Sequence, residues 1–217
     1  IEQREATDMK SPICDISVLL SLLVIICMLR RILEIFPSLL ASLIRWKESV
    51  NLFNSVKLSR SINMTALSMV VPFCLAASAS RMYCPSFMES MGDDARFGIT
   101  LGVFMLFITL RMILERFCAP KRRNQQMYRC ACRSSYIFFT LLTILLISLW
   151  GILSVMNVDA NTSRDAMLWL SGVIYLIFIL RKTQIFTSSC SLFTAFLYLC
   201  ALEILPVGAL VASAVIL

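Results

Sequence analysis

The segment that decides the fold is Tyr136–Met156, which reads YIFFTLLTILLISLWGILSVM and carries no charged residue. A helix of about 20 apolar residues is long enough to cross a hydrocarbon core about 30 Å thick. The run Ile144–Ile147 is apolar at every position, whereas a strand of a membrane β-barrel alternates apolar and polar side chains. The segment therefore predicts a transmembrane α-helix.

Five more segments have the same character, and the composition of the whole chain agrees with them. Hydrophobic residues make up 59% of the chain and charged residues 15%, against about 45–50% and about 25% in soluble domains. We predict an all-α fold, with residues 1–217 forming one transmembrane domain, a polytopic bundle of about six helices. Besides 136–156, the predicted spans are residues 13–29, 62–80, 97–114, 166–180 and 192–217.

Lysines and arginines are distributed unequally between the two sides of the predicted bundle. Fifteen of the 20 lie in or next to the links after the first, third and fifth spans, and five lie on the other side. Because cytoplasmic loops of membrane proteins carry an excess of Lys and Arg, we predict that these links are cytoplasmic and that both termini are outside. The formal net charge of +7 would then face an anionic inner leaflet. We expect this lipid surface, and no nucleic acid, as the partner of the basic residues.

The first basic link contains an amphipathic pattern. Leu43, Trp46, Val50 and Phe53 recur at helical spacing within residues 43–57. The pattern predicts either a helix that lies flat in the membrane interface or a helix that packs on the ends of the spans.

Glu203 is the only charged residue of the last predicted span. At 1.5 Å per residue it lies roughly 17 Å from the start of that span, near the middle of the bilayer. A carboxylate at that depth costs about 2.5–3.5 kcal/mol or more and marks a candidate functional site. Pro206 follows about one turn later and leaves the carbonyl of Leu202 without its helical donor, which predicts a kink and a polar pocket.

Two roles are open for Glu203. It forms either a proton or cation site, or an interhelical ion pair or hydrogen bond that fixes packing. Arg111, inside the third predicted span, is the candidate partner. Its alternatives are an i,i+4 pair with Glu115 and an extended side chain that reaches the headgroups. We predict an intramembrane polar site composed of Glu203, Pro206 and Arg111.

Several kinds of chemistry lack the residues that they need. The chain has no histidine, the most common catalytic base and metal ligand. Its sequence contains no nucleophile–base set, no dinucleotide fingerprint and no phosphate-binding loop. Cys118, Cys130 and Cys132 have no fourth ligand nearby, so we interpret them as reduced thiols, with lipidation as the alternative. We expect no catalytic residue, no metal and no cofactor.

The run Leu197–Pro206 reads LYLCALEILP. It resembles the last helix of an uncharacterised family of polytopic inner-membrane proteins from Bacteroidota, a domain of unknown function. The match covers these ten residues, and the rest of the chain matches only in its pattern of spans. The resemblance implies a bacterial inner membrane and includes Glu203 and Pro206 in its motif. It implies no catalytic or binding residue.

These observations favour a non-enzymatic integral membrane subunit, a scaffold or accessory component of a cell-envelope complex that has other membrane proteins as partners. Runs of small residues at 76–80 and 209–214 support this hypothesis, because small residues let helices approach closely in lipid. The alternative is a small channel or proton-coupled transporter that uses Glu203, since the spans 62–80 and 192–217 each contain a central proline. A third hypothesis, an enzyme that acts on lipid, lacks a visible nucleophile and base.

Overall fold

The structure is a computed structural model, and it describes residues 16, 18–27, 30, 32–34, 56–88, 91–117, 125–187 and 192–216. Over these residues the chain is helical and contains no strand, which confirms the predicted all-α fold. From residue 56 onward the elements are α4 (Val56–Ser68), α5 (Val70–Ala79), a short 3₁₀ turn η1 (Ser86–Met88), α6 (Asp93–Phe117), α7 (Gln125–Val155), α8 (Ala160–Thr187), α9 (Leu192–Leu199), the π-helical turn η2 (Cys200–Ile204) and α10 (Leu205–Ile216).

Five helical stretches of the described chain are long and apolar enough to cross a membrane, so the protein is a polytopic helical bundle. They are Ile62–Ala79, Asp93–Phe117, Ser134–Val155, Ala160–Thr187 and Phe196–Ala214. Within the first predicted span, the described residues include a shorter apolar helix, Val18–Cys27. The predicted amphipathic segment 43–57 lies outside the described residues, except for Val56 and Lys57 at the start of α4.

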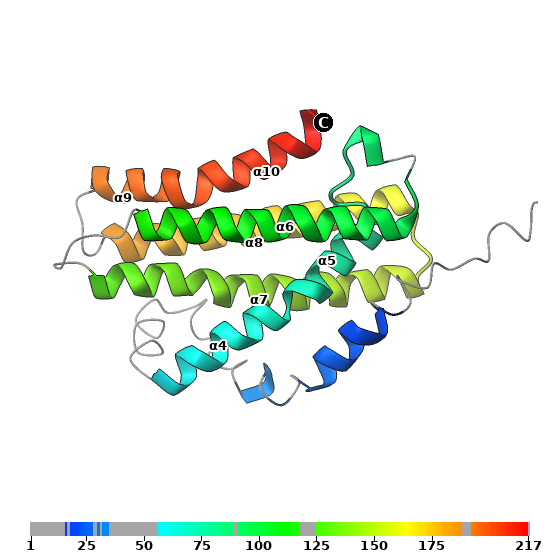
Figure 1. Ribbon diagram of the computed structural model, residues 1–217, viewed down its shortest axis with the longest axis horizontal. Coiled ribbons are helices and arrows are strands. Elements are labelled where there is room, and N and C mark those ends of the chain that lie inside the picture. The colour runs from blue at the N-terminus through cyan, green and yellow to red at the C-terminus, as the bar shows by residue number, and fades with distance from the viewer. Residues whose placement is uncertain are drawn as a thin grey trace, which may run out of the picture.

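The second predicted span is divided into two helices near its proline. Pro72 has no N–H to donate to the carbonyl of Ser68, and its ring crowds the preceding turn. Helix α4 therefore ends at Ser68, and α5 resumes at Val70. Both helices pack on α7 and run obliquely across it (Figure 1).

The remaining helices form the body of the bundle. Helix α7 packs along α8, α6 packs on α5, and both η2 and α10 contact α6. Figure 1 shows α9 and α10 as one long rod along the side of the bundle, with η2 between them. Helices α6 and α8 end, and α7 and α9 begin, at the same end of the bundle, on the left in Figure 1. We call this the α9 end.

Two apolar clusters of the described core lie at different heights. One cluster contains Val70, Cys74 and Phe104, with the rings of Phe73 and Phe139 packed against it. The second cluster lies nearer the α9 end and is built from Tyr128, Ala131, Cys132, Ile185, Phe186 and Leu202. Along α7, the segment between these two clusters holds Ser134 and Ser135, which are both buried. Polar groups therefore occupy the layer between two apolar ones.

Helix α8 corrects one assignment made from the sequence. The predicted fifth span ends at residue 180, with Arg181 and Lys182 counted as cations of a cytoplasmic link, but the helix continues to Thr187. Arg181 is half-buried and donates a hydrogen bond to Gln184 Oε1 at 3.0 Å. Lys182 instead faces the interior and is 1% exposed. The charge of Lys182 is paired inside the bundle with Glu203, so the helix can continue past this cation.

Candidate functional site

Glu203 is placed by an irregular turn of the last membrane-spanning helix. The backbone widens into the π-helical turn η2 at Cys200–Ile204, and the N–H of Leu205 donates to the carbonyl of Cys200. Pro206 follows directly and cannot supply the N–H that would bond to Leu202 in a regular helix. Such π turns are rare and frequently lie at functional sites. Here the turn directs Glu203 into the bundle, where it is 1% exposed.

Two cations from two other helices converge on this carboxylate. Arg111 of α6 donates to Glu203 Oε1 at 2.5 Å, and the Lys182 ammonium donates to the same oxygen. Both cations also donate to Ser135 Oγ of α7, Arg111 through Nη2 and Lys182 across 3.3 Å. The interactions therefore connect α6, α7, α8 and η2 at one point.

Arg111 makes both of the pairings that the sequence left as alternatives. Besides Glu203, its Nε lies 3.2 Å from Glu115 Oε1, one turn further along α6. The backbone carbonyl of Glu115 accepts a hydrogen bond of 2.7 Å from the Tyr128 hydroxyl of α7. Arg111 thus bridges two carboxylates, and we call Arg111, Glu115, Ser135, Lys182 and Glu203 the ionic cluster.

Lys182 is the member that sequence reasoning missed. It lies on the buried face of α8 together with Phe178, Ile185 and Phe186, and its ammonium is 5.2 Å from the centroid of the Phe178 ring. A partial signal was present in the sequence. The apolar members of this face recur at spacings of three and four, the periodicity of one helix face, but Arg181 stands at such spacings from Phe178 and Ile185 too. Extending the helical pattern beyond residue 180 therefore brings a cation to the buried face without deciding which of the two it is.

The charges of the ionic cluster balance. Two cations face two carboxylates, so the cluster is neutral as a whole. Burial of an unpaired ion is expensive, and pairing with good hydrogen bonds is what makes buried ions tolerable. The arrangement therefore pairs both cations with one oxygen of Glu203. It supports the packing role, in which removal of any one partner leaves an uncompensated charge.

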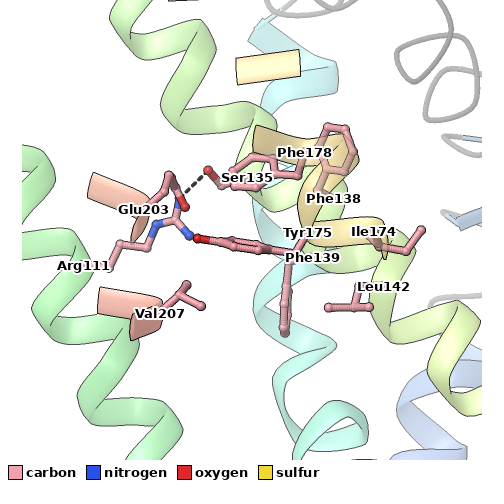
Figure 2. Close-up of a pocket in the computed structure, with 10 residues that line it drawn as sticks. All are labelled: Arg111, Ser135, Phe138, Phe139, Leu142, Ile174, Tyr175, Phe178, Glu203 and Val207. Atoms are coloured by element: carbon pink, nitrogen blue, oxygen red, sulfur yellow. Dashed lines mark hydrogen bonds and ion pairs between the residues drawn. The ribbon is translucent and has the colours of Figure 1, made fainter. Parts of the chain in front are cut away.

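Two polar atoms next to the ionic cluster are left unsatisfied within the described part of the chain. Glu203 Oε2 and the Tyr175 hydroxyl are buried and have no hydrogen-bond partner there. Both residues line a cavity of about 110 Å³ between α7 and α8, whose walls are otherwise mainly Phe138, Phe139 and Phe178. Figure 2 shows the Arg111 guanidinium between the Glu203 carboxylate and the Tyr175 ring, with Ser135 above. The cavity is large enough for a few water molecules.

Glu203 lies eleven residues after the start of α9 at Leu192, roughly 17 Å along the helix axis. Arg111 is six residues from the end of α6 at Phe117, about 9 Å along the helix axis. On α6, the ionic cluster therefore lies in the half of the helix toward the α9 end.

Ser135 and Lys182 have the residue types of a serine–lysine catalytic pair, but their contacts are those of charge pairing. In such a pair the lysine must be a neutral base that removes the serine proton. Lys182 instead donates to Glu203, and the oxygen of Ser135 accepts from both Lys182 and Arg111. Ser135 is thus held as an acceptor, which does not activate it as a nucleophile.

Cys132 is the other candidate nucleophile near the ionic cluster. Burial raises the pKa of its thiol to about 11, although Lys182 and Arg111 act in the opposite direction. Since the thiolate is the reactive form of cysteine, Cys132 is a poor nucleophile near neutral pH. Cys118 lies outside the described residues, and so does the side chain of Cys130. In the described ranges, no group of three potential metal ligands occurs.

The comparisons with known proteins give a family and no activity. No curated protein and no solved structure matches the chain. One family model matches over residues 16–213, which is nearly the whole chain and includes all members of the ionic cluster. The protein therefore belongs to the family described as domain of unknown function DUF4271.

Proposed function

We propose that this protein is a non-enzymatic integral membrane subunit that associates through helix α6 with another membrane protein of a cell-envelope complex. The observation that carries the proposal is a pair of exposed glycines, Gly98 and Gly102, one turn apart on α6. A Cβ atom added at either position meets no other atom within 4 Å. The two glycines thus have no packing role inside the protein.

A glycine without a packing role is costly in a helix. It destabilises a helix interior by about 1 kcal/mol relative to alanine. In lipid, the Gly-x-x-x-Gly spacing lets two helix backbones approach closely, and such pairs mark association faces. At 100° per residue, Gly98 and Gly102 point away from the buried residues of this helix, which are Arg96, Thr100 and Phe104. This face is therefore directed outward, where a partner helix would bind.

The ionic cluster supports the same function in a different way. Its interactions connect α6 with α7, α8 and η2, so the glycine face belongs to a helix that is held firmly in the bundle. A preorganised face loses less conformational entropy on association than a mobile one. The proposal includes the orientation predicted from the sequence, in which the basic links face the cytoplasm and the membrane is a bacterial inner membrane.

Association can be tested by replacing one glycine with a bulky residue. We expect Gly102→Ile to abolish co-purification of partner proteins in mild detergent. Gly172→Ile on α8 is the matched control, because Gly172 is also exposed and a Cβ there meets nothing within 4 Å. Recovery of the same lone monomer from the wild type and from both variants would refute the proposal.

A second function, a channel or proton-coupled transporter, is favoured by one observation. Glu203 Oε2 is buried without a described partner at the wall of the 110 Å³ cavity, and carboxylates in such places form part of proton pathways. Reconstituted flux that is lost in Glu203→Gln, in a variant that remains folded, would support transport. Flux that is absent from the wild type, or unchanged in Glu203→Gln, would eliminate it.

A further inference from the structure

A cleft larger than the 110 Å³ cavity lies on the other side of Arg111. It has a volume of about 310 Å³ and lies between α4, α5, α6 and α7, within the range of sites that bind small molecules. Arg111, Ser135 and Phe139 line both this cleft and the 110 Å³ cavity. The ionic cluster therefore separates the two spaces.

The cleft is polar at one end and apolar along its length. Its polar end carries Arg111 and Glu115 of α6 and Asn63 of α4, while Val70 and Phe104 lie at the opposite end. From Phe104 to Glu115 the helix rises roughly 17 Å. A ligand that fits this shape has an extended hydrocarbon chain and a compact polar head.

The depth of the polar end identifies the kind of head group. Glu115 is two residues from the end of α6, about 3 Å along the axis, and Arg111 is about 9 Å from it. Phospholipid head groups lie outside the hydrocarbon core, beyond the ends of a spanning helix, and the long side chains of Arg111 and Glu115 can extend toward them from this end of α6. The apolar part of the cleft then lies at the depth of the acyl chains.

The charges at the polar end favour a zwitterionic head over an anionic one. Arg111 and Glu115 are each about one-fifth exposed, so both offer charge to a ligand in the cleft. A phosphate would face the guanidinium of Arg111, while an ammonium would face the carboxylate of Glu115. An anionic head with no ammonium would bring its negative charge next to Glu115 without compensation.

We propose that this cleft is a binding site for one phospholipid with a phosphate and a primary ammonium, that is, a phosphatidylethanolamine. Its phosphate pairs with Arg111, its ammonium donates to Glu115, and one acyl chain extends past Phe107 toward Val70. The site is independent of the association face proposed for α6, because Gly98 and Gly102 do not line the cleft.

The test uses the full chain in detergent and native mass spectrometry with added phosphatidylethanolamine, phosphatidylcholine or phosphatidylglycerol. We expect the wild type to retain one phosphatidylethanolamine at least fivefold more often than either of the other lipids. Phosphatidylcholine has the same charges without N–H donors, and phosphatidylglycerol has the phosphate without an ammonium. Retention of phosphatidylglycerol or phosphatidylcholine equal to or above that of phosphatidylethanolamine would overturn the proposal.

Two variants localise the lipid. Leu67→Trp fills the cleft from α4, at a side chain that is 69% exposed, and should lower retention at least fivefold. Leu106→Trp is the control, because Leu106 is 70% exposed on α6 and does not line the cleft. Glu115→Gln should remove the preference for phosphatidylethanolamine over phosphatidylcholine. Equal retention in Leu67→Trp and Leu106→Trp would place the lipid elsewhere and refute the site.

Discussion

Helix α6 carries one paired arginine in each half. Arg96 is buried, Arg111 is about one-fifth exposed, and the two are paired in different ways. The partners of Arg96 lie at the start of its own helix. Arg96 forms an ion pair with Asp93 at 3.0 Å and donates a hydrogen bond to the carbonyl of Met91 at 3.2 Å. Arg111 binds residues that are distant in sequence, Ser135 and Glu203, besides its neighbour Glu115.

Because their partners differ, the two arginines stabilise different parts of the fold. The partner of Arg96 is a carboxylate that is 74% exposed, so water still solvates that charge, and the pair stabilises mainly the first turn of α6. The partner Glu203 of Arg111 is buried and lies on another helix. Loss of the first pair is a local event, whereas loss of the second leaves charges unpaired in the interior.

The largest effect is expected from Glu203→Gln, which leaves Lys182 and Arg111 without their shared carboxylate. Removal of one partner of a buried ion pair costs about 3–5 kcal/mol, and we expect a loss of that size in the free energy of unfolding. Equilibrium unfolding in mixed detergent micelles measures it. Stability equal to that of the wild type would show that the cluster is hydrated and does not hold the helices together.

The second-largest effect is a recovery of stability in a double variant. In the Glu203→Gln background, Lys182→Met removes the cation that was left unpaired and replaces it with an apolar side chain of similar length. We expect the double variant to recover more than half of the lost stability, because Arg111 keeps Glu115 as its partner. Strictly additive losses in the double-mutant cycle would contradict a direct interaction between Lys182 and Glu203.

A third experiment tests whether the surroundings of Arg111 are dry. Because burial raises the pKa of the Cys132 thiol to about 11, the neutral thiol predominates at every pH below that value. We expect maleimide labelling of Cys132 to be slow at pH 7 and to accelerate about tenfold per pH unit up to about pH 10. Mass spectrometry of the labelled peptide measures the rate, with Cys132→Ala as the blank. A rate that no longer rises above pH 8 would indicate a water-filled site.

The smallest effect is expected at the other arginine. Asp93→Asn removes an exposed partner of Arg96 and one acidic residue from the first turn of α6. Exposed ion pairs contribute about 0–1 kcal/mol, so the free energy of unfolding should fall by about 1 kcal/mol or less. A loss as large as that of Glu203→Gln would remove the contrast between the two arginines.

The sequence was sufficient for what depends on local pattern. The uncharged run at 136–156 predicted a membrane helix, and α7 spans it. Glu203 and Arg111 could be named as polar residues inside spans, because a charge in an apolar run is visible without a structure. The break between α4 and α5 was not predicted, although the missing N–H of Pro72 accounts for it.

What could not be predicted depends on the angular position of one helix relative to the others. Lys182 lies next to Arg181 in the sequence, and only the rotation of α8 decides which of the two enters the bundle. The convergence of Lys182 and Arg111 on one oxygen of Glu203 also requires the π turn. Nothing in the local composition of Cys200–Ile204 distinguishes that turn from a regular α-helix.

The π turn also makes the last membrane helix respond unequally to changes in length. A π turn holds one more residue than the α turn that it replaces, so deletion of one residue from Cys200–Ile204 would restore an α turn and leave α9 and α10 close to their present orientation. Insertion of one residue would instead rotate α9 by about 100° relative to α10. Tyr198, which stacks on Phe186 before the turn, would then be misaligned if Ser213 kept its hydrogen bond to Tyr83 after it.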